Sequence, residues 1–447
     1  MRKIILSLVF GGVLVAKSQS NVLPAEKQKT PIVINNATIH TGNGETMENA
    51  TIVIVDGKIS AVGKNVTGPT GAEVIDAKGK HVYPGIILPT SNLGLVEISA
   101  VKASNDAREI GDMNPNVRSL VAYNTDSKVI NTLRSNGVLM ANIIPQGSFL
   151  AGSSSVVQLD AWNWEDAAVK ADGGMHLYMP TLMPRPNFGR FGGGGGGMPG
   201  GPNAGAQPDP VKEGFEQIEK LKMFFKEAKA YLASPTHEET NLKFESVKNL
   251  FDKKQKFYVH GNTVKQMLAA LDFVKGFGFE MVIVGGSESY QIADLLKQHN
   301  VSVILSQMHA LPTSADDDID QPYKSAAALQ KAGVLFSISD DDSQTRGRNI
   351  MFNAGTAATY GLTKEQALSA ITLNAAKIMG VADKTGSIEV GKEANIIISS
   401  GDILDMRTNN VTDAFIQGRK INLDDKQKQL NDRYEKKYDL KKAPKPF

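Results

Sequence analysis

The sequence has 447 residues and contains no cysteine. This absence excludes disulfide bonds, thiolate metal sites and cysteine nucleophiles, so any bound metal must be held by His, Asp or Glu. Charges of the two signs nearly balance, with 49 Lys and Arg against 47 Asp and Glu, and aromatic residues make up only 6% of the chain. A net charge of +2 provides no extended field for a polyanion. We therefore expect no nucleic-acid partner.

The first twenty residues have the pattern of a secretory signal peptide. Arg2 and Lys3 precede an apolar stretch over residues 4–16, and Ser18 and Ser20 form a small-x-small cleavage motif. The apolar stretch is shorter than the roughly 20 residues that a membrane-spanning helix needs. We expect cleavage after residue 20 and a periplasmic or secreted protein without a membrane span.

The pattern of apolar and turn-forming residues divides the rest of the chain into two β-rich end segments and a long central segment. Residues 31–86 and 385–425 carry short β-branched runs separated by turn signals. Residues 87–384 alternate apolar strand-like runs with amphipathic helical patterns, and this alternation is typical of a parallel sheet. We predict an α/β fold, a (β/α)8 TIM-like barrel with a small composite β-sandwich domain formed by both chain ends. A Gly-rich insertion over 189–210 and a polar basic tail over 426–447 complete the chain.

Two residues are placed for chemistry because each ends a predicted barrel strand. His260 follows Phe-Tyr-Val, and Asp340 follows Ile-Ser at the end of another apolar run. A barrel presents its working groups at the C-terminal ends of its strands, where an imidazole and a carboxylate can hold a divalent ion and activate water. Two protein ligands do not make a tight metal site. His176 and His309 are further candidate ligands, although isolated histidines are more often structural.

Three motifs resemble one known family. Val-Tyr-Pro-Gly-Ile-Ile at 82–87, Thr-Leu-Asn-Ala-Ala-Lys-Ile-Met-Gly at 372–380 and Gly-Ser-Ile-Glu-Val-Gly-Lys-Glu-Ala-Asn at 386–395 are similar to the first barrel strand, the last helix and the return to the β domain of the amidohydrolase superfamily. The imidazolonepropionase-like and dihydroorotase-like branches are the nearest in pattern. The resemblance implies a hydrolase of C–N bonds in non-peptide or cyclic amides that uses a divalent metal.

The resemblance also implies metal ligands that this sequence lacks. The family ends its first strand with Asp-x-His-x-His, and here Thr90 and Asn92 stand at the two histidine positions. Gly285 stands where strand six has its histidine, and Thr181 is the match for the strand-four ligand. The strand-five histidine and the strand-eight aspartate are retained, as His260 and Asp340. Neutral Thr and Asn bind divalent ions weakly, so the usual two-metal centre is not expected.

Both tryptophans of the chain, Trp162 and Trp164, lie in a polar stretch over residues 160–166. Aromatic side chains beside polar ones suit recognition of a peptide or sugar, whereas the alternative is burial against the barrel wall. With Thr90 and Asn92, they are the predicted substrate-binding residues.

Two functional hypotheses follow. The first is an exported amidohydrolase-type enzyme with a degraded metal centre and impaired activity, in which Asp340 is the general base, His260 and Asp340 hold one divalent ion (zinc, manganese or iron), or no ion is bound. The alternative is a non-catalytic module that binds a small-molecule or peptide-like ligand, or a homo- or hetero-oligomeric partner subunit of an active amidohydrolase.

Overall fold

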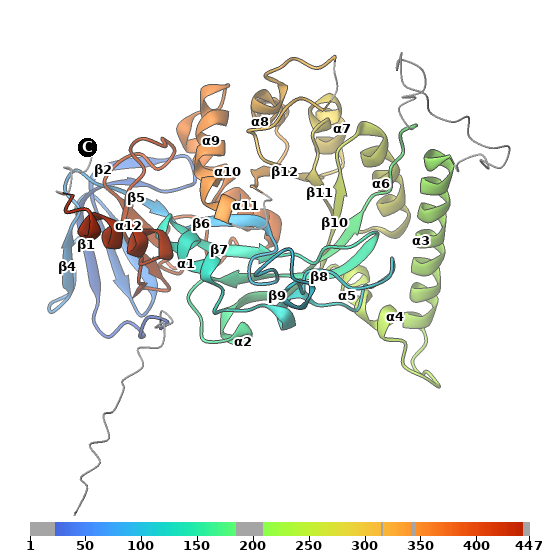
Figure 1. Cartoon of the computed structure of the whole chain (residues 1–447), viewed down its shortest axis with the longest axis horizontal. Helices are drawn as coiled ribbons and strands as arrows, with labels where there is room; N and C mark the ends of the chain where they lie inside the picture. Colours follow the sequence, from blue (N-terminus) through green and yellow to red (C-terminus); the bar gives the residue numbers. More distant parts are fainter. Residues whose placement is uncertain (1–22, 185–208, 314–315, 341–344, 441–447) are drawn as a thin grey trace, which may run out of the picture.

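The computed structural model describes residues 23–184, 209–313, 316–340 and 345–440 (Figure 1). The predicted signal peptide and all but the last two residues of the predicted Gly-rich insertion lie outside these described residues. No helix in the described ranges is long and apolar enough to cross a membrane.

Strands from the two chain ends share one eight-stranded sheet, in the order β16-β15-β14-β5-β1-β2-β3 with β4 paired to β1. The antiparallel pair of β5 and β14 joins the two ends of the chain. The apolar side chains of this sheet form a separate core cluster, which includes Ile34, Ile52 and Ile396. The strands are β1 (Ile32–His40), β2 (Thr46–Val55), β3 (Lys58–Gly63), β4 (Glu73–Asp76), β5 (His81–Pro84), β14 (Ile396–Ser399), β15 (Val411–Ile416) and β16 (Arg419–Lys420).

The second sheet also has eight strands, and their spatial order follows the chain from β6 to β13. These are β6 (Ile86–Ser91), β7 (Val138–Ile143), β8 (Leu150–Gln158), β9 (Ala168–Tyr178), β10 (Lys256–Gly261), β11 (Met281–Gly285), β12 (Ser302–Leu305) and β13 (Phe336–Ile338). The two outer strands are linked by a hydrogen bond. Thr90 Oγ1, near the end of β6, lies 2.6 Å from Ser339 Oγ, directly after β13, so the sheet is nearly closed into a barrel.

One strand of the barrel runs against the others. β8 is antiparallel to both β7 and β9, whereas the remaining neighbours are parallel. Antiparallel strands can be joined by short connections, while parallel ones need a crossover, so residues 138–178 form a meander around β8. The predicted strict alternation of strand and helix therefore holds for the second half of the barrel and not for this part.

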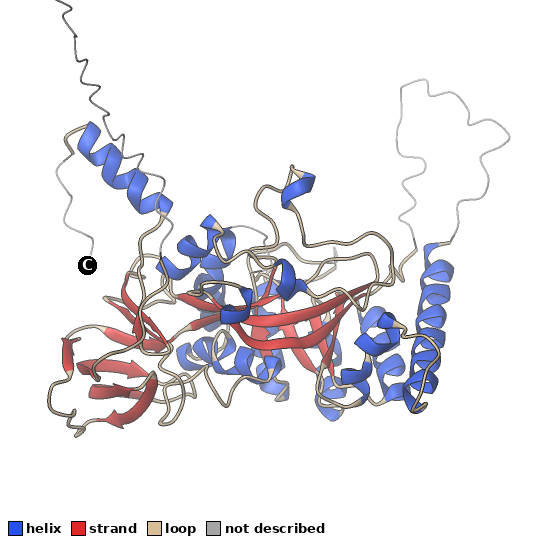
Figure 2. Cartoon of the chain, turned by 90° about the horizontal axis from the view of Figure 1, so that it is seen from below, coloured by secondary structure: helices blue, strands red, loops and turns tan. Residues whose placement is uncertain are grey.

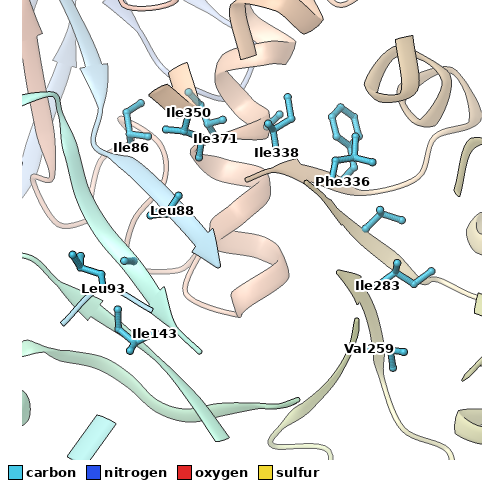
Figure 3. Packing of buried hydrophobic residues seen from close by; sticks show 14 of the residues in the cluster. Ile86, Leu88, Leu93, Ile143, Val259, Ile283, Phe336, Ile338, Ile350 and Ile371 are labelled. Atoms are coloured by element: carbon cyan, nitrogen blue, oxygen red, sulfur yellow. The ribbon is translucent and has the colours of Figure 1, made fainter. Parts of the chain in front are cut away.

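Helices cover the outer face of the barrel sheet (Figures 1 and 2). Phe225 of α3 packs against Phe257 of β10 and Phe273 of α6, with ring centroids 5.9 and 5.5 Å apart. Figure 3 shows the same core where Val259, Ile283 and Phe336 lie on β10, β11 and β13. The helices are α1 (Lys128–Ser135), α2 (Trp164–Ala167), α3 (Pro210–Ala233), α4 (Leu242–Ser246), α5 (Lys248–Phe251), α6 (Val264–Phe277), α7 (Ala293–Gln298), α8 (Gln321–Ala332), α9 (Ile350–Thr359), α10 (Lys364–Ala370), α11 (Leu373–Met379) and α12 (Lys426–Lys437).

Local sequence signals set helix ends near the strand ends. α6 begins after a capping box, in which Thr263 and Gln266 each satisfy the other's backbone N–H, and it ends at Gly278 in the left-handed conformation. α10 begins with the same device at Thr363 and Gln366. These caps fix where the chain leaves β10 and where it turns after α9, and both turns lie at the edge of the barrel.

A buried ion cluster joins the two sheets. Asp160, whose side chain is fully buried, accepts from Arg134 Nη1 at 2.5 Å and from Arg419 Nη1 at 2.7 Å. The backbone N–H of Ala25 donates to the same carboxylate at 2.9 Å. A buried carboxylate with two guanidinium partners is compensated, and these contacts hold β16 and the N-terminal segment against the end of β8.

Candidate functional site at the barrel mouth

The C-terminal ends of the parallel barrel strands place a layer of polar side chains inside the barrel. β9 and β10 pair in register, with Tyr258 opposite His176 and His260 opposite Tyr178. Because side chains two residues apart share one face of a strand, these four rings lie on one surface. Tyr178 stacks on His260 with ring centroids 4.0 Å apart, and Tyr258 stacks on His176 at 4.8 Å.

His176 and His260 form a hydrogen-bonded imidazole pair. Nδ1 of His176 lies 2.9 Å from Nε2 of His260. Sequence reasoning placed His260 correctly at a strand end but treated His176 as one of several isolated histidines. The available signal was the aromatic spacing of two residues on both segments, His176 with Tyr178 and Tyr258 with His260, which predicts two matching strand faces.

Burial keeps both imidazoles uncharged at neutral pH. His176 is fully buried, and His260 is partly buried at the mouth. Desolvation lowers the pKa of His260 to about 3. Desolvation and, to a smaller extent, the neighbouring His260 hold the pKa of His176 well below its ordinary value. In the described part of the chain, Nε2 of His176 is buried and has no hydrogen-bond partner.

At the end of the first barrel strand, β6, Thr90 provides a hydroxyl and Asn92 provides an amide. Thr90 and Ser339 are both almost fully buried, and their hydroxyls contact each other across the junction of β6 and β13. Asn92 is also buried, one residue beyond β6. Thr90 is therefore committed to closing the barrel.

Asp340 is buried two residues after the end of β13 and is held by a side chain of α9. Its Oδ2 accepts a hydrogen bond of 3.2 Å from Asn353 Nδ2. The other end of the Asn353 amide accepts from the backbone N–H of Met308 at 2.7 Å. Asn353 thus connects the carboxylate of Asp340 to the segment that follows β12, which fixes the orientation of that carboxylate.

Gly285, the last residue of β11 and the sixth-strand position of the barrel, has a backbone conformation that disfavours any side chain. Its φ is +97°, and a Cβ built there would lie 2.5 Å from Oδ1 of Asn262. That conformation favours glycine, and the contact is far closer than a Cβ tolerates. A residue with a Cβ at this position would therefore need another local backbone conformation and a shift of the Asn262 side chain.

These residues do not fit a two-metal centre. His176 and His260 offer two nitrogens that face each other, and the described residues contain no group of three or more His, Asp or Glu arranged to hold a metal ion. A zinc site uses three or four protein ligands. The predicted pairing of His260 with Asp340 in one metal site has no third donor among the described residues.

Two cavities adjoin at the mouth, because Gln307 lines both. One, of about 150 Å³, is lined by Asp340, His309 and Asn353 among others. The other, of about 270 Å³, lies over the ends of β10, β11 and β12, and Asp317 is the only charged residue in its described lining. A nearly uncharged lining favours a small, uncharged ligand.

The remaining predicted site residues do not join this layer. Trp162 is 66% exposed, and Trp164 starts α2, which directly precedes the first residue of β9. Both therefore lie at the opposite end of β9 from His176, because β8 reverses the chain. Thr181 is exposed three residues beyond β9. His309 contacts Thr356 Oγ1 at 2.7 Å and lies beside Asp340.

The chain is similar in sequence to several known proteins. A family model described as the amidohydrolase family matches residues 203–421. An imidazolonepropionase from Thermoanaerobacter pseudethanolicus is 22% identical over 395 residues, which cover 80% of this chain and 85% of that protein. An imidazolonepropionase from Thermoplasma volcanium is 37% identical over 82 residues, so the chain matches only 20% of that protein's length and uses 18% of its own.

Solved structures show the same fold. An amidohydrolase from Thermotoga maritima superposes with a TM-score of 0.74 at 24% identity, over 88% of this chain and 99% of that one. An adenosine deaminase from Xanthomonas campestris with bound zinc superposes with a TM-score of 0.52 at 14% identity, over 92% and 99% of the two chains.

Proposed function

This chain belongs to the amidohydrolase superfamily, and from that premise we propose that its barrel mouth binds a small, uncharged amide and hydrolyses C–N bonds only at an impaired rate. The observation that carries the proposal is the donor set at the mouth. An imidazole pair, a hydroxyl pair and a glycine stand at or beside the positions where the superfamily resemblance implies metal ligands.

The size and lining of the mouth support a small ligand. The cavity of about 270 Å³ lies over three strand ends, where barrel enzymes bind substrates. Its side chains are mostly amides, hydroxyls and apolar groups, which can hydrogen-bond an amide and enclose its carbon skeleton. The resemblance to enzymes of cyclic and non-peptide amides agrees with this chemistry.

Asp340 is the group placed to act as a general base. Its carboxylate lines the smaller cavity, and Asn353 fixes its orientation. A water in that cavity would give its proton to Asp340 while its oxygen attacks an amide carbon in the larger cavity. Asp340 would then pass this proton to the amide nitrogen as the C–N bond breaks, which releases an amine and a carboxylic acid. General-base catalysis of this kind contributes about 10²–10⁴-fold, much less than a full metal centre with its activated water.

The test is a panel of C–N substrates, with hydantoin, dihydrouracil and N-acetyl amino acids, offered to protein stripped with a chelator and to protein reloaded with zinc. We expect slow hydrolysis that is equal in the two preparations and is lost in Asp340→Asn. The control is Asp126→Asn, because Asp126 is exposed and lines neither cavity. A zinc-dependent gain of about 100-fold or more would contradict the proposal.

The second candidate is a non-catalytic partner subunit in a homo- or hetero-oligomer. The segment between β6 and α1 favours it, because Ile98, Val101 and Ile110 are 58%, 45% and 88% exposed. Apolar side chains gathered on one exposed segment are typical of protein contacts. Sedimentation of the purified chain, with and without Ile110→Asp, would detect self-association that depends on this segment.

We also propose that the protein is exported to the periplasm or secreted. The proposal rests on the signal-peptide pattern of residues 1–20, which lie outside the described residues. Fractionation followed by N-terminal sequencing should find a mature protein that starts at Asn21 outside the cytoplasm. An intact Met1 in the cytoplasmic fraction would contradict it.

A further inference from the structure

The imidazole pair raises the question of which nitrogen carries the proton between the rings. A neutral imidazole has one N–H and one acceptor nitrogen. Nδ1 of His176 and Nε2 of His260 are 2.9 Å apart, so one of them donates and the other accepts. The choice determines the tautomer of both rings.

The surroundings of His176 decide between the two directions. If His260 donated, the single proton of His176 would lie on its Nε2. That atom is buried and has no hydrogen-bond partner in the described part of the chain. A buried N–H without a partner costs about 1–3 kcal/mol and is rare in proteins. If His176 donates instead, the same Nε2 is an unprotonated nitrogen, and no donor is left unsatisfied.

We propose that His176 is a positioning residue that donates its Nδ1–H to Nε2 of His260, so that His260 is held with its own proton on Nδ1 and offers this N–H to the carbonyl oxygen of a ligand. This inference deepens the proposed function and rests on it for the nature of the ligand. His260 is the more exposed ring of the two, and it lies two residues before Asn262, which lines the larger cavity.

Two contacts hold the His260 ring in place. Tyr178 stacks on it at 4.0 Å with an angle of 14° between the rings, and the Tyr178 hydroxyl donates to the carbonyl of Pro145 at 3.0 Å. The ring is thus clamped between a stacked tyrosine and the nitrogen of His176. A neutral, oriented N–H can stabilise negative charge on a carbonyl oxygen without moving a proton in advance.

The tautomer can be measured without any ligand by long-range ¹H–¹⁵N correlation spectra of full-length mature protein labelled at its seven histidines. His176→Phe and His260→Phe assign the two rings. We expect His260 to give the pattern of a protonated Nδ1 and an unprotonated Nε2 at pH 7. A protonated Nε2 on His260, or an imidazolium pattern for either ring, would overturn the inference.

Two His176 variants separate positioning from packing. Asn in place of His176 keeps a donor near the Nδ1 position, so His176→Asn should preserve the His260 tautomer, whereas His176→Phe should give a mixture. Thermal melts show whether each variant is folded. If the tautomer is unchanged in folded His176→Phe, His176 does not set it and the inference fails.

The ligand half of the inference is tested with 2-pyrrolidinone, a cyclic amide, and with cyclopentane-methanol, which has no carbonyl, as the control. Only the amide should shift the Nδ1 signal of His260, with affinity about tenfold lower in His176→Phe, the usual value of one hydrogen bond. No shift would overturn the role of Nδ1–H as the donor to the ligand. The tautomer spectra do not depend on hydrolysis, so a failed substrate panel would leave them readable.

Discussion

The molecule contains two hydrogen-bonded histidine pairs of nearly equal geometry. In the sheet formed by the chain ends, Nε2 of His40 lies 3.0 Å from Nδ1 of His81, and in the barrel the corresponding distance between His176 and His260 is 2.9 Å. A tyrosine stacks on a histidine of each pair, Tyr83 on His40 with centroids 4.4 Å apart in the first.

The two histidine pairs differ in whether a carboxylate contacts one of the imidazole rings. Nδ1 of His40 lies 2.6 Å from Oε1 of Glu365, whose carboxylate comes from α10 of the barrel. The pair of His40 and His81 therefore has a carboxylate beside it, and burial together with the neighbouring His40 lowers the pKa of His81. No carboxylate touches the barrel pair among the described residues. The same contact thus serves a charged junction in one place and a neutral site in the other.

The largest expected effect comes from acid. The pKa of His260 is about 3 in the folded protein and about 6.5 when unfolded, so the unfolded chain binds more protons between these values. Stability is present above pH 6.5 and is lost as the pH falls, by about 2 kcal/mol at pH 5 for His260, with a loss of the same sign from His176. Urea unfolding at pH 7 and pH 5 measures this.

The control for the acid experiment is the double variant His176→Gln with His260→Gln, which removes both titrating rings. Its stability should change less between pH 7 and pH 5 than that of the wild-type protein. Equal losses in both proteins would mean that the barrel pair is already charged or exposed, and the comparison of the two pairs would no longer hold.

A second test asks whether the barrel pair can be given a third donor. Gly285→His and Gly285→Ala should each lose about 2 kcal/mol of unfolding free energy, because any Cβ strains a φ of +97° and meets Asn262. Neither should bind zinc. Gly276→Ala in α6 is the matched control, since a Cβ there meets open space and a helical alanine is favoured. Stoichiometric zinc in Gly285→His would contradict the account.

A smaller effect is expected at the charged junction. The contact of His40 with Glu365 joins an imidazole nitrogen to a carboxylate oxygen at 2.6 Å, and both side chains are mostly buried. A double-mutant cycle of His40→Gln and Glu365→Gln should give a coupling of about 0.5–1 kcal/mol in the unfolding free energy. Asp402 and Lys364 also face this junction and should stay unchanged in the cycle. A coupling of zero would show that the contact does not stabilise the junction.

The smallest effect is expected at Trp162, which lies away from both pairs. Trp162→Ala should change the unfolding free energy by less than about 0.5 kcal/mol, because its side chain is 66% exposed. Binding of 2-pyrrolidinone, measured by the same spectra, should also stay unchanged. Weaker binding in Trp162→Ala would show that this tryptophan contacts the ligand.

The comparison also shows how far the sequence alone leads. The barrel, the β-rich ends and the placement of His260 and Asp340 at strand ends follow from alternation and motifs. The reversed strand β8 does not, because its buried positions hold Ser153, Ser154 and Ser155, and such residues are typical of loops. The sequence alone groups Trp162 with the substrate-binding residues and does not show the contact of His176 with His260, since both depend on which strands are neighbours and in which direction they run.

The retained residues illustrate the same limit. His260 and Asp340 match a superfamily pattern, and the pattern implies a metal. The sequence does not show that Thr90 is hydrogen-bonded to Ser339, or that Gly285 has a backbone conformation that disfavours any side chain. The sequence identifies the residue at each of these positions, whereas the contacts between them required the structure.

The most direct test of the central claim is the metal content of mature protein purified without chelators, determined by elemental analysis beside His260→Ala. The account predicts less than about one tenth of an equivalent of zinc, manganese or iron in both proteins, since two facing imidazoles do not make a tight site. About one equivalent in the wild-type protein, lost in His260→Ala, would contradict it and would establish a metal centre at the mouth.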